Sequence, residues 1–251
     1  MEDAVFDRDA KKLAELIRQD PGFNVNMNHG PGDTLLHHAC SGDSRSAVIP
    51  LLLAHPDIDV NLKIKYGQTP FSLACWHGRT SCVREMLRDS RVKVNQPDND
   101  GWTPLWWASR NGYLDIIKWW ISSGREMNLG TPGDVDRTDA IGAAKQRGKT
   151  EVATLLERFK SDAAQTRHAL RVELDWYDEL AAKMFALVVF ISDGLLQVKD
   201  TTPAARFFSI AAQLPLKLQM VLCYRMVGSD KEIIPGNDSE VAFKHLAREL
   251  W

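Results

Sequence analysis

The sequence has no excess of charge of one sign. Its 251 residues include 31 lysines and arginines and 33 aspartates and glutamates, so the formal net charge at pH 7 is −2. Proteins that bind nucleic acids or membrane surfaces by long-range electrostatics carry a marked basic excess. The charge balance therefore gives no reason to expect a nucleic-acid or membrane partner.

Long apolar runs are also missing. The longest run, residues 184–191, is far shorter than the roughly 20 residues that a helix needs to cross a bilayer. The first residues, Met1-Glu2-Asp3, are acidic and lack the basic and apolar regions of a signal peptide. We expect a cytoplasmic protein, and a nuclear location stays open.

Cysteine is scarce, and the four cysteines do not occur in closely spaced pairs. The four cysteines lie far apart or without a regular interval, at Cys40, Cys75, Cys82 and Cys223. A disulfide framework or a zinc site would show recurring short spacings. We expect four reduced thiols in an intracellular compartment.

Motifs of common catalytic sites are absent as well. The chain has no glycine-rich phosphate loop, no G-x-S-x-G nucleophile turn and no H-E-x-x-H metal motif. A carboxylate run flanks Trp176-Tyr177 at Asp175, Asp178 and Glu179, but such a run is usually a solvated helix face. We expect no enzyme activity and no cofactor.

Tryptophan, by contrast, is abundant, and the stretch Gly101–Trp120 (GWTPLWWASRNGYLDIIKWW) holds most of it. Thr103-Pro104 opens a helix there, because proline in a first helical turn loses no helical hydrogen bond. The small Ala108 allows two helices to approach closely, and Gly112 supplies a tight turn before a second apolar helix. The stretch therefore predicts a helix–turn–helix unit.

The same unit recurs along the chain at steps of 33 to 35 residues. Four markers keep this register: the small alanine, the helix-opening threonine, the apolar anchor of the second helix and a closing asparagine. They lie at Ala4, Ala39, Ala74, Ala108 and Ala143; at Thr34, Thr69, Thr103 and Thr138; at Leu13, Val48, Val83, Ile117 and Val152; and at Asn26, Asn61, Asn95 and Asn128. One such unit cannot bury its apolar face alone, so neighbouring copies pack together.

This pattern resembles the ankyrin repeat with its T-P-L-x-x-A core, and it covers about residues 1–160. The resemblance implies an all-α solenoid of helix–turn–helix units with short β-hairpin-like loops. We expect a truncated or capping first unit at 1–28, then units at 29–63, 64–97 and 98–130, and a capping unit at 131–160. The rest, 161–251, should form a small helical C-terminal domain.

Two departures from the repeat pattern are local. Asp43 stands where Gly78 and Gly112 stand in the next two units, and Asp139 replaces the proline after the last threonine. The second unit also carries His37-His38-x-Cys40, which looks like a metal-ligand spacing. The register assigns Cys40 and the other two cysteines of the repeats to core positions, so we expect no metal.

The C-terminal segment shows helix periodicity instead of a repeat register. Apolar residues at three- and four-residue steps predict one helix from about 170 to 191. Asp193-Gly194 either ends this helix or forms a hairpin turn, and we favour the helix end. Further helices are expected after Thr202-Pro203, after Leu214-Pro215 up to Gly228, and from Asp238 or Ser239 to near Leu250. The segment is also similar to tails that follow the repeats in some fungal ankyrin proteins.

Ankyrin repeats bind other proteins, and the resemblance implies that this chain does too. In the family, loop tips and the ends of the first helices touch the partner, on a concave surface. Carried over by register, these positions are Lys65, Tyr66, Gln68, Trp76, His77, Asn99, Asp100, Trp102, Arg110, Asn111, Arg137 and Lys145.

The residue types at these positions point the same way. Tyrosine, tryptophan and arginine are the side chains most often found as interface anchors, so Tyr66, Trp76, Trp102 and Arg110 suggest a binding patch. The alternative is that the two tryptophans only pack across adjacent loops. The other tryptophans of the stretch, Trp106, Trp107, Trp119 and Trp120, are expected to be packing residues, with one of the last two partly exposed.

The expected function is therefore recognition of a protein partner by a monomeric, rigid, non-catalytic scaffold. One alternative depends on residues Leu214–Leu222, which loosely resemble the L-P-x-x-L of an F-box or the L-P-L of a SOCS box. Either box would make the chain a substrate adaptor of a ubiquitin ligase. A second alternative is that the repeats mainly hold the chain's own C-terminal domain.

Overall fold

The computed structural model describes residues 10–20, 22–28, 33–130, 138–193, 208, 210–227, 234, 238, 241 and 242. The chain forms two compact units, Met1–His168 and Ala169–Trp251. The division lies eight residues beyond the predicted boundary after residue 160, and the predicted limits of the individual repeats stay a prediction.

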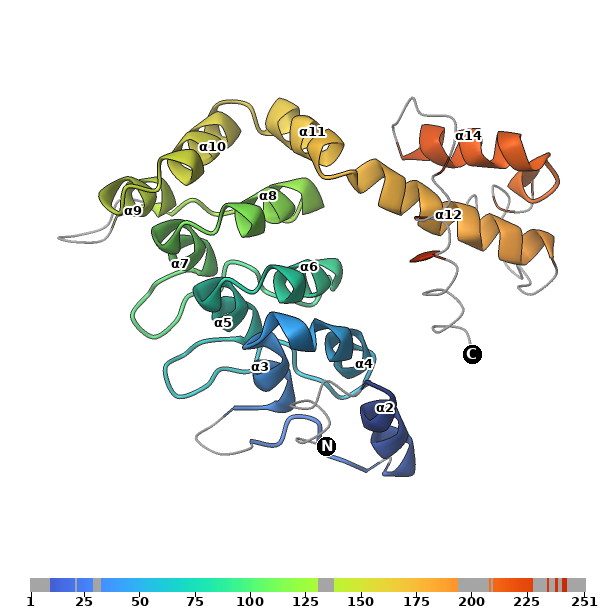
Figure 1. Cartoon of the computed structure of the whole chain (residues 1–251). Coiled ribbons are helices and arrows are strands. Elements are labelled where there is room, and N and C mark those ends of the chain that lie inside the picture. Colours follow the sequence, from blue (N-terminus) through green and yellow to red (C-terminus); the bar gives the residue numbers. More distant parts are fainter. Residues whose placement is uncertain are drawn as a thin grey trace. The chain divides into compact units, whose positions relative to one another are not determined.

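The first unit consists of two layers of helices (Figure 1). One layer holds the first helices of the repeats, α3 (Leu35–Cys40), α5 (Pro70–His77), α7 (Pro104–Asn111) and α9 (Ala140–Gln146). The other holds the second helices: η1 (Asp43–Val48) with α4 (Ile49–Leu53), then α6 (Thr80–Arg88), α8 (Leu114–Ser123) and α10 (Thr150–Ser161), and α2 (Ala10–Gln19) precedes them. Each helix packs on its counterpart in the next repeat, and the described ranges contain no sheet. The predicted all-α repeat solenoid is confirmed.

Threonine side chains begin the first helices of the central repeats. Thr69 Oγ1 accepts a hydrogen bond from the Ser72 backbone N–H at 3.1 Å, and Thr103 Oγ1 accepts one from Trp106 N–H at 3.2 Å. In the last repeat the prediction that Thr138 opens the helix is wrong. The cap is Asp139, whose Oδ1 accepts from Gly142 N–H at 2.7 Å, because no proline follows Thr138 and aspartate is the stronger cap.

Glycine ends the first helices of the central repeats, as predicted. Gly78 and Gly112 lie in the left-handed region, with φ of 71° and 81°. Asp43, which replaces glycine in the preceding repeat, has another role. It begins η1, and its Oδ1 accepts the backbone N–H of Ser81 at 2.8 Å, at the start of α6 in the next repeat.

The closing asparagines join each repeat to the next. Each carboxamide donates from Nδ2 to a backbone carbonyl 30 or 31 residues later and accepts at Oδ1 from a backbone N–H 32 or 33 residues later. The bonds are Asn26 to Asp57 O (2.7 Å) and from Asp59 N (2.8 Å), Asn61 to Arg91 O (2.9 Å) and from Lys93 N (2.7 Å), and Asn95 to Glu126 O (3.4 Å) and from Asn128 N (3.1 Å). This ladder explains why asparagine keeps the register.

We expect Asn61→Ala to lower the stability of the repeats by about 1–2 kcal/mol, because it leaves a carbonyl and an N–H of the next repeat without their side-chain partner. Urea unfolding followed by far-UV circular dichroism measures the change. Asn128→Ala is the matched control, since the Asn128 side chain accepts only from the nearby Gly130 N–H among the described residues. Equal losses in the two variants would contradict the ladder.

Two adjacent tryptophans of α8 have different surroundings. Trp120 is fully buried, and its ring meets Phe71 edge-on with centroids 5.0 Å apart. Trp119 is half-buried, and the Arg84 guanidinium lies 3.8 Å from its ring centroid. The prediction that one of the pair is partly exposed is confirmed.

In the second unit the predicted single helix from 170 to 191 is wrong. α11 (Ala163–Glu173), which begins in the first unit, ends before Leu174, and α12 (Trp176–Ser192) is a separate helix. Asp175 between them has φ of 49°, and a left-handed residue cannot continue a right-handed helix. Aspartate tolerates this conformation better than an apolar residue does. α12 ends at Ser192, as the preferred interpretation of Asp193-Gly194 requires.

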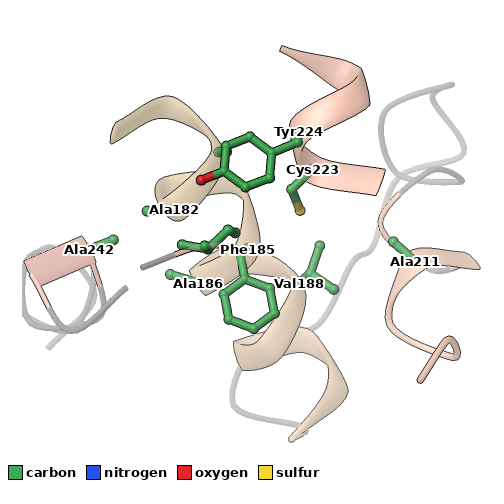
Figure 2. Packing of buried hydrophobic residues seen from close by; sticks show 10 residues of the cluster. Ala182, Phe185, Ala186, Val188, Ala211, Cys223, Tyr224 and Ala242 are labelled. Atoms are coloured by element: carbon green, nitrogen blue, oxygen red, sulfur yellow. The ribbon is translucent and has the colours of Figure 1, made fainter. Parts of the chain in front are cut away.

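The core of the second unit lies between α12 and α14 (Leu216–Met226), as Figure 2 shows. Phe185 and Val188 of α12 pack with Cys223 and Tyr224 of α14. Pro215 precedes α14, as predicted from Leu214-Pro215. Of the helix expected after Thr202-Pro203, the described residues Phe208, Ile210 and Ala211 are helical. The stop at Gly228 and most of the last helix to Leu250 lie outside the described residues.

Candidate functional site

Two loop tips of neighbouring repeats are joined by backbone and side-chain hydrogen bonds. The Asn99 backbone N–H donates to Tyr66 O at 3.1 Å, and Asn99 Nδ2 donates to Lys65 O at 3.0 Å. Gly67 makes this contact possible: its φ is 76°, and a Cβ there would lie 2.1 Å from Asn99 Oδ1. The two loops therefore present their exposed side chains at a fixed separation.

Buried Asp98 joins the second of these loops to α7. Its Oδ1 accepts the backbone N–H groups of Asp100 (3.1 Å) and Trp102 (2.9 Å), which fixes the loop. Its Oδ2 accepts the indole Nε1–H of Trp107 at 2.9 Å. One carboxylate thus positions two tryptophans.

Five aromatic side chains lie in a continuous line from the loop tip to the helix ends. Trp102 stacks on Trp106 (3.9 Å between centroids), Trp106 meets Trp107 edge-on (4.9 Å), Trp107 lies against Trp76 (5.5 Å), and Trp76 stacks on His77 (5.1 Å). We call these five residues the aromatic row. It spans two repeats and unites tryptophans that the sequence analysis had placed in two groups.

Polar side chains at the end of α7 complete the arrangement. The Arg110 guanidinium carbon lies 5.5 Å from the Trp106 ring centroid and 5.8 Å from that of Trp107, within cation–π range. Asn111 Nδ2 donates to Trp76 O at 3.2 Å and so ties α7 to the end of α5.

Most of the predicted contact residues reach the surface. Lys65, Tyr66, His77, Asn99, Asp100 and Lys145 are exposed, and Trp102, Arg110 and Asn111 are half-buried. Tyr66 is 67% exposed and Trp76 37%. Tyr66 has no ring contact with the aromatic row among the described residues, and Lys145 Nζ is paired with Glu157 at 2.5 Å.

Two predicted contact residues are not found on the described surface. Gln68 was expected on the loop tip but is only 5% exposed, because its backbone carbonyl closes the loop by accepting from Ile64 N–H at 3.0 Å and the residue turns into the repeat. Gln68 is therefore not part of the exposed surface. Arg137 lies outside the described residues.

Sequence reasoning missed three residues of this site, namely Asp98, Trp106 and Trp107. The two tryptophans do pack, as expected, but they pack against Trp102 and Trp76 and remain half-buried. The spacing Asp98-x-x-x-Trp102 was a usable signal, since an aspartate before a turn often accepts the backbone N–H groups that follow it.

The cysteines of the described residues are free and buried. Burial raises the pKa of each thiol, to about 12 for Cys82 and about 11 for Cys223, so the neutral form dominates near pH 7. Within the described ranges no cluster of three or more His, Cys, Asp or Glu could hold a metal ion. The same ranges contain no helix long and apolar enough to span a membrane.

The repeats, the loop tips and the ladder define a class of protein. A family model described as ankyrin repeats (3 copies) matches residues 2–98 and 47–131, together just over half of the sequence. The chain belongs to the ankyrin-repeat family, which is an interaction fold without catalytic machinery of its own. The match does not extend to Leu214–Leu222 and gives no support to a ubiquitin-ligase adaptor.

Several curated proteins are similar to this chain. SMC5-SMC6 complex localization factor protein 1 of Bos taurus is 38% identical over 189 residues, covering 72% of this chain and 18% of that protein. The Homo sapiens protein of the same name is 38% identical over 107 residues, with 43% and 10% covered. Rabankyrin-5 of Mus musculus is 30% identical over 107 residues, with 43% and 9% covered. The chain thus spans less than a fifth of the length of these relatives.

Proposed function

We propose that this chain is a non-catalytic protein-binding module, which binds its partner with the aromatic row, Arg110 and the loop tips around Tyr66 and Asp100. We call this set the binding surface. The observation that carries the proposal is the aromatic row itself. Its rings keep part of their apolar surface exposed at positions where ankyrin repeats contact their partners.

The way the row is held supports this function. Asp98 accepts one hydrogen bond each from Trp102, Trp107 and the Asp100 backbone, and Asn111 fixes the backbone of Trp76. Side chains that are ordered before binding lose little conformational entropy in the complex, so more of the contact energy appears as affinity. Loops without such hydrogen bonds would lose more conformational entropy on binding.

The relatives suggest which partners to test first. Two of them are named as localization factors of the SMC5-SMC6 complex, so that complex is the first candidate. Since the chain covers only a small part of those proteins, the partner stays a proposal. We also propose that the chain acts as a monomer, without nucleic acid or membrane, in the cytoplasm or the nucleus.

We expect the double variant Trp76→Ala, Trp102→Ala to weaken partner binding about 30-fold or more, because truncating an aromatic anchor typically costs about 2 kcal/mol or more. Pull-down with purified SMC5-SMC6 complex, and then with cell extract, compares the double variant with the unmodified chain. Trp119→Ala, which removes a half-buried tryptophan of α8 outside the binding surface, is the matched control.

Circular dichroism separates the possible results. Lost binding with unchanged helical content supports the binding surface. Unchanged binding by a folded double variant contradicts it. Unfolding of the double variant means that Trp76 and Trp102 are core residues of the repeats, which also contradicts it.

A further inference from the structure

A cation without an acidic partner lies on the binding surface. The Arg110 guanidinium lies close to the rings of both Trp106 and Trp107, and it makes no ion pair among the described residues. Its pairing groups are therefore open to a ligand. A guanidinium placed beside two rings keeps its planar fork in a limited range of orientations, which suits two-point binding of a carboxylate.

Two acidic groups that contact residues of the candidate site already have partners. Both oxygens of Asp98 accept hydrogen bonds, from the backbone of Asp100 and Trp102 and from the Trp107 indole. Glu157 is paired with Lys145. Asp100 is the one predicted contact residue that carries a negative charge on this surface.

Further basic groups lie on the repeats that carry the binding surface. The Lys149 side chain packs against Gly112, directly after the helix that carries Arg110, since a Cβ on Gly112 would lie 2.6 Å from Lys149 Cδ. Arg147 follows α9, the helix packed on α7, and Lys65 lies on the loop tip. All three are exposed and make no ion pair among the described residues. Arg110, Lys149 and Arg147 therefore give the helix-end side of the binding surface three basic groups, although the whole chain has a net charge of −2.

We propose that the binding surface recognises an acidic peptide segment of its partner, in which a carboxylate lies next to an aromatic or aliphatic side chain. The carboxylate pairs with Arg110, and the apolar side chain packs on the exposed face of Trp76 or Trp102. Additional acidic residues of the segment lie near Lys149 and Arg147. This inference rests on the proposed function, since it names the partner chemistry of the same surface.

A selection from random peptides displayed on phage, with the full chain as bait, tests the inference without a known partner. Enriched sequences are synthesised with a fluorophore, and their affinity is measured by fluorescence anisotropy at low and high salt. We expect enriched peptides to carry Asp or Glu beside Trp, Phe or Leu, and to bind more weakly as salt increases.

Variants then assign the carboxylate contact. Arg110→Gln should weaken these peptides about tenfold or more, and Arg110→Lys should keep part of the affinity, because it retains the charge but not the fork. Arg158→Gln makes the same charge change on an exposed residue of α10, in the other helix layer, and should have no effect. If Arg110→Gln does not fold, the partial loss of affinity in Arg110→Lys tests the carboxylate contact instead.

The outcomes distinguish this inference from the proposed function. Peptides that lack acidic residues, or that bind Arg110→Gln normally but lose binding to Trp76→Ala, Trp102→Ala, overturn the inference and leave the proposed function intact. Peptides that bind both variants normally overturn both. Failure to enrich any peptide counts against both as well.

Discussion

Trp120→Ala is expected to lower the free energy of unfolding by about 3–5 kcal/mol, the range measured for large-to-small aromatic replacements in cores. Trp120 has no exposed surface, its ring packs edge-on against Phe71 of α5, and its Nε1–H donates to Glu126 O at 3.2 Å. The replacement leaves a cavity between the two helix layers and an unpaired carbonyl. Urea unfolding followed by far-UV circular dichroism measures the loss.

The neighbouring residue provides the control for this prediction. Trp119 is half-buried, and the Arg84 guanidinium lies over its ring, a kind of interaction worth about 0.5–1 kcal/mol at exposed sites. Because part of its side chain faces solvent, Trp119→Ala should cost clearly less than Trp120→Ala. Similar losses for the two variants would contradict the orientation of α8 that buries Trp120 and leaves Trp119 partly exposed.

The stability of the repeats should fall as the pH is lowered from 6.5 to about 4, through protonation of His37. Burial lowers the pKa of His37 from 6.5 to about 4 in the folded chain. Its Nδ1 accepts the backbone N–H of Thr34 at 3.3 Å, so the neutral ring carries its proton on Nε2, which lies 3.4 Å from Gln68 O in the next repeat. The folded repeat thus requires the neutral ring.

The sign and size of this effect follow from proton linkage. Between pH 6.5 and about 4 the unfolded chain binds a proton at His37 and the folded chain does not, so stability decreases as the pH falls. Across the whole window the loss approaches about 3 kcal/mol, and above pH 6.5 it vanishes.

Urea unfolding of the unmodified chain and of His37→Gln, above pH 6.5 and near pH 4, isolates this contribution from that of the carboxylates. The difference in stability between the two proteins should shrink as the pH falls. Parallel pH dependence in the two would mean that His37 titrates normally, and would contradict its burial.

The repeats could be predicted from the sequence because each marker has one physical cause that recurs from repeat to repeat. Threonine caps a helix, glycine permits a left-handed turn, and asparagine joins consecutive repeats; the first two act within a few residues. Where another local cause competed, the prediction failed. Asp139 displaced Thr138 as the cap, and Asp175 interrupted a periodic helix that otherwise looked continuous.

The candidate site was only partly predictable, since it depends on contacts between repeats. Register placed Trp76 and Trp102 near the surface, but it could not show that Trp106 and Trp107 connect them. Nor could it show that Gln68 turns inward while Lys65 and Tyr66 of the same loop are exposed. The hydrogen bonds of the loop set the direction of a loop side chain, and the periodicity of the sequence does not predict these hydrogen bonds.

Amide hydrogen exchange of the chain with and without its bound partner tests the central claim most directly, because it locates the contact without any substitution. The proposed function predicts slower exchange on binding in residues 65–67, 76–77, 98–102 and 104–111, which carry the loop tips and the aromatic row. Protection confined to the second helices α6 and α8, or to residues 169–251, would contradict it.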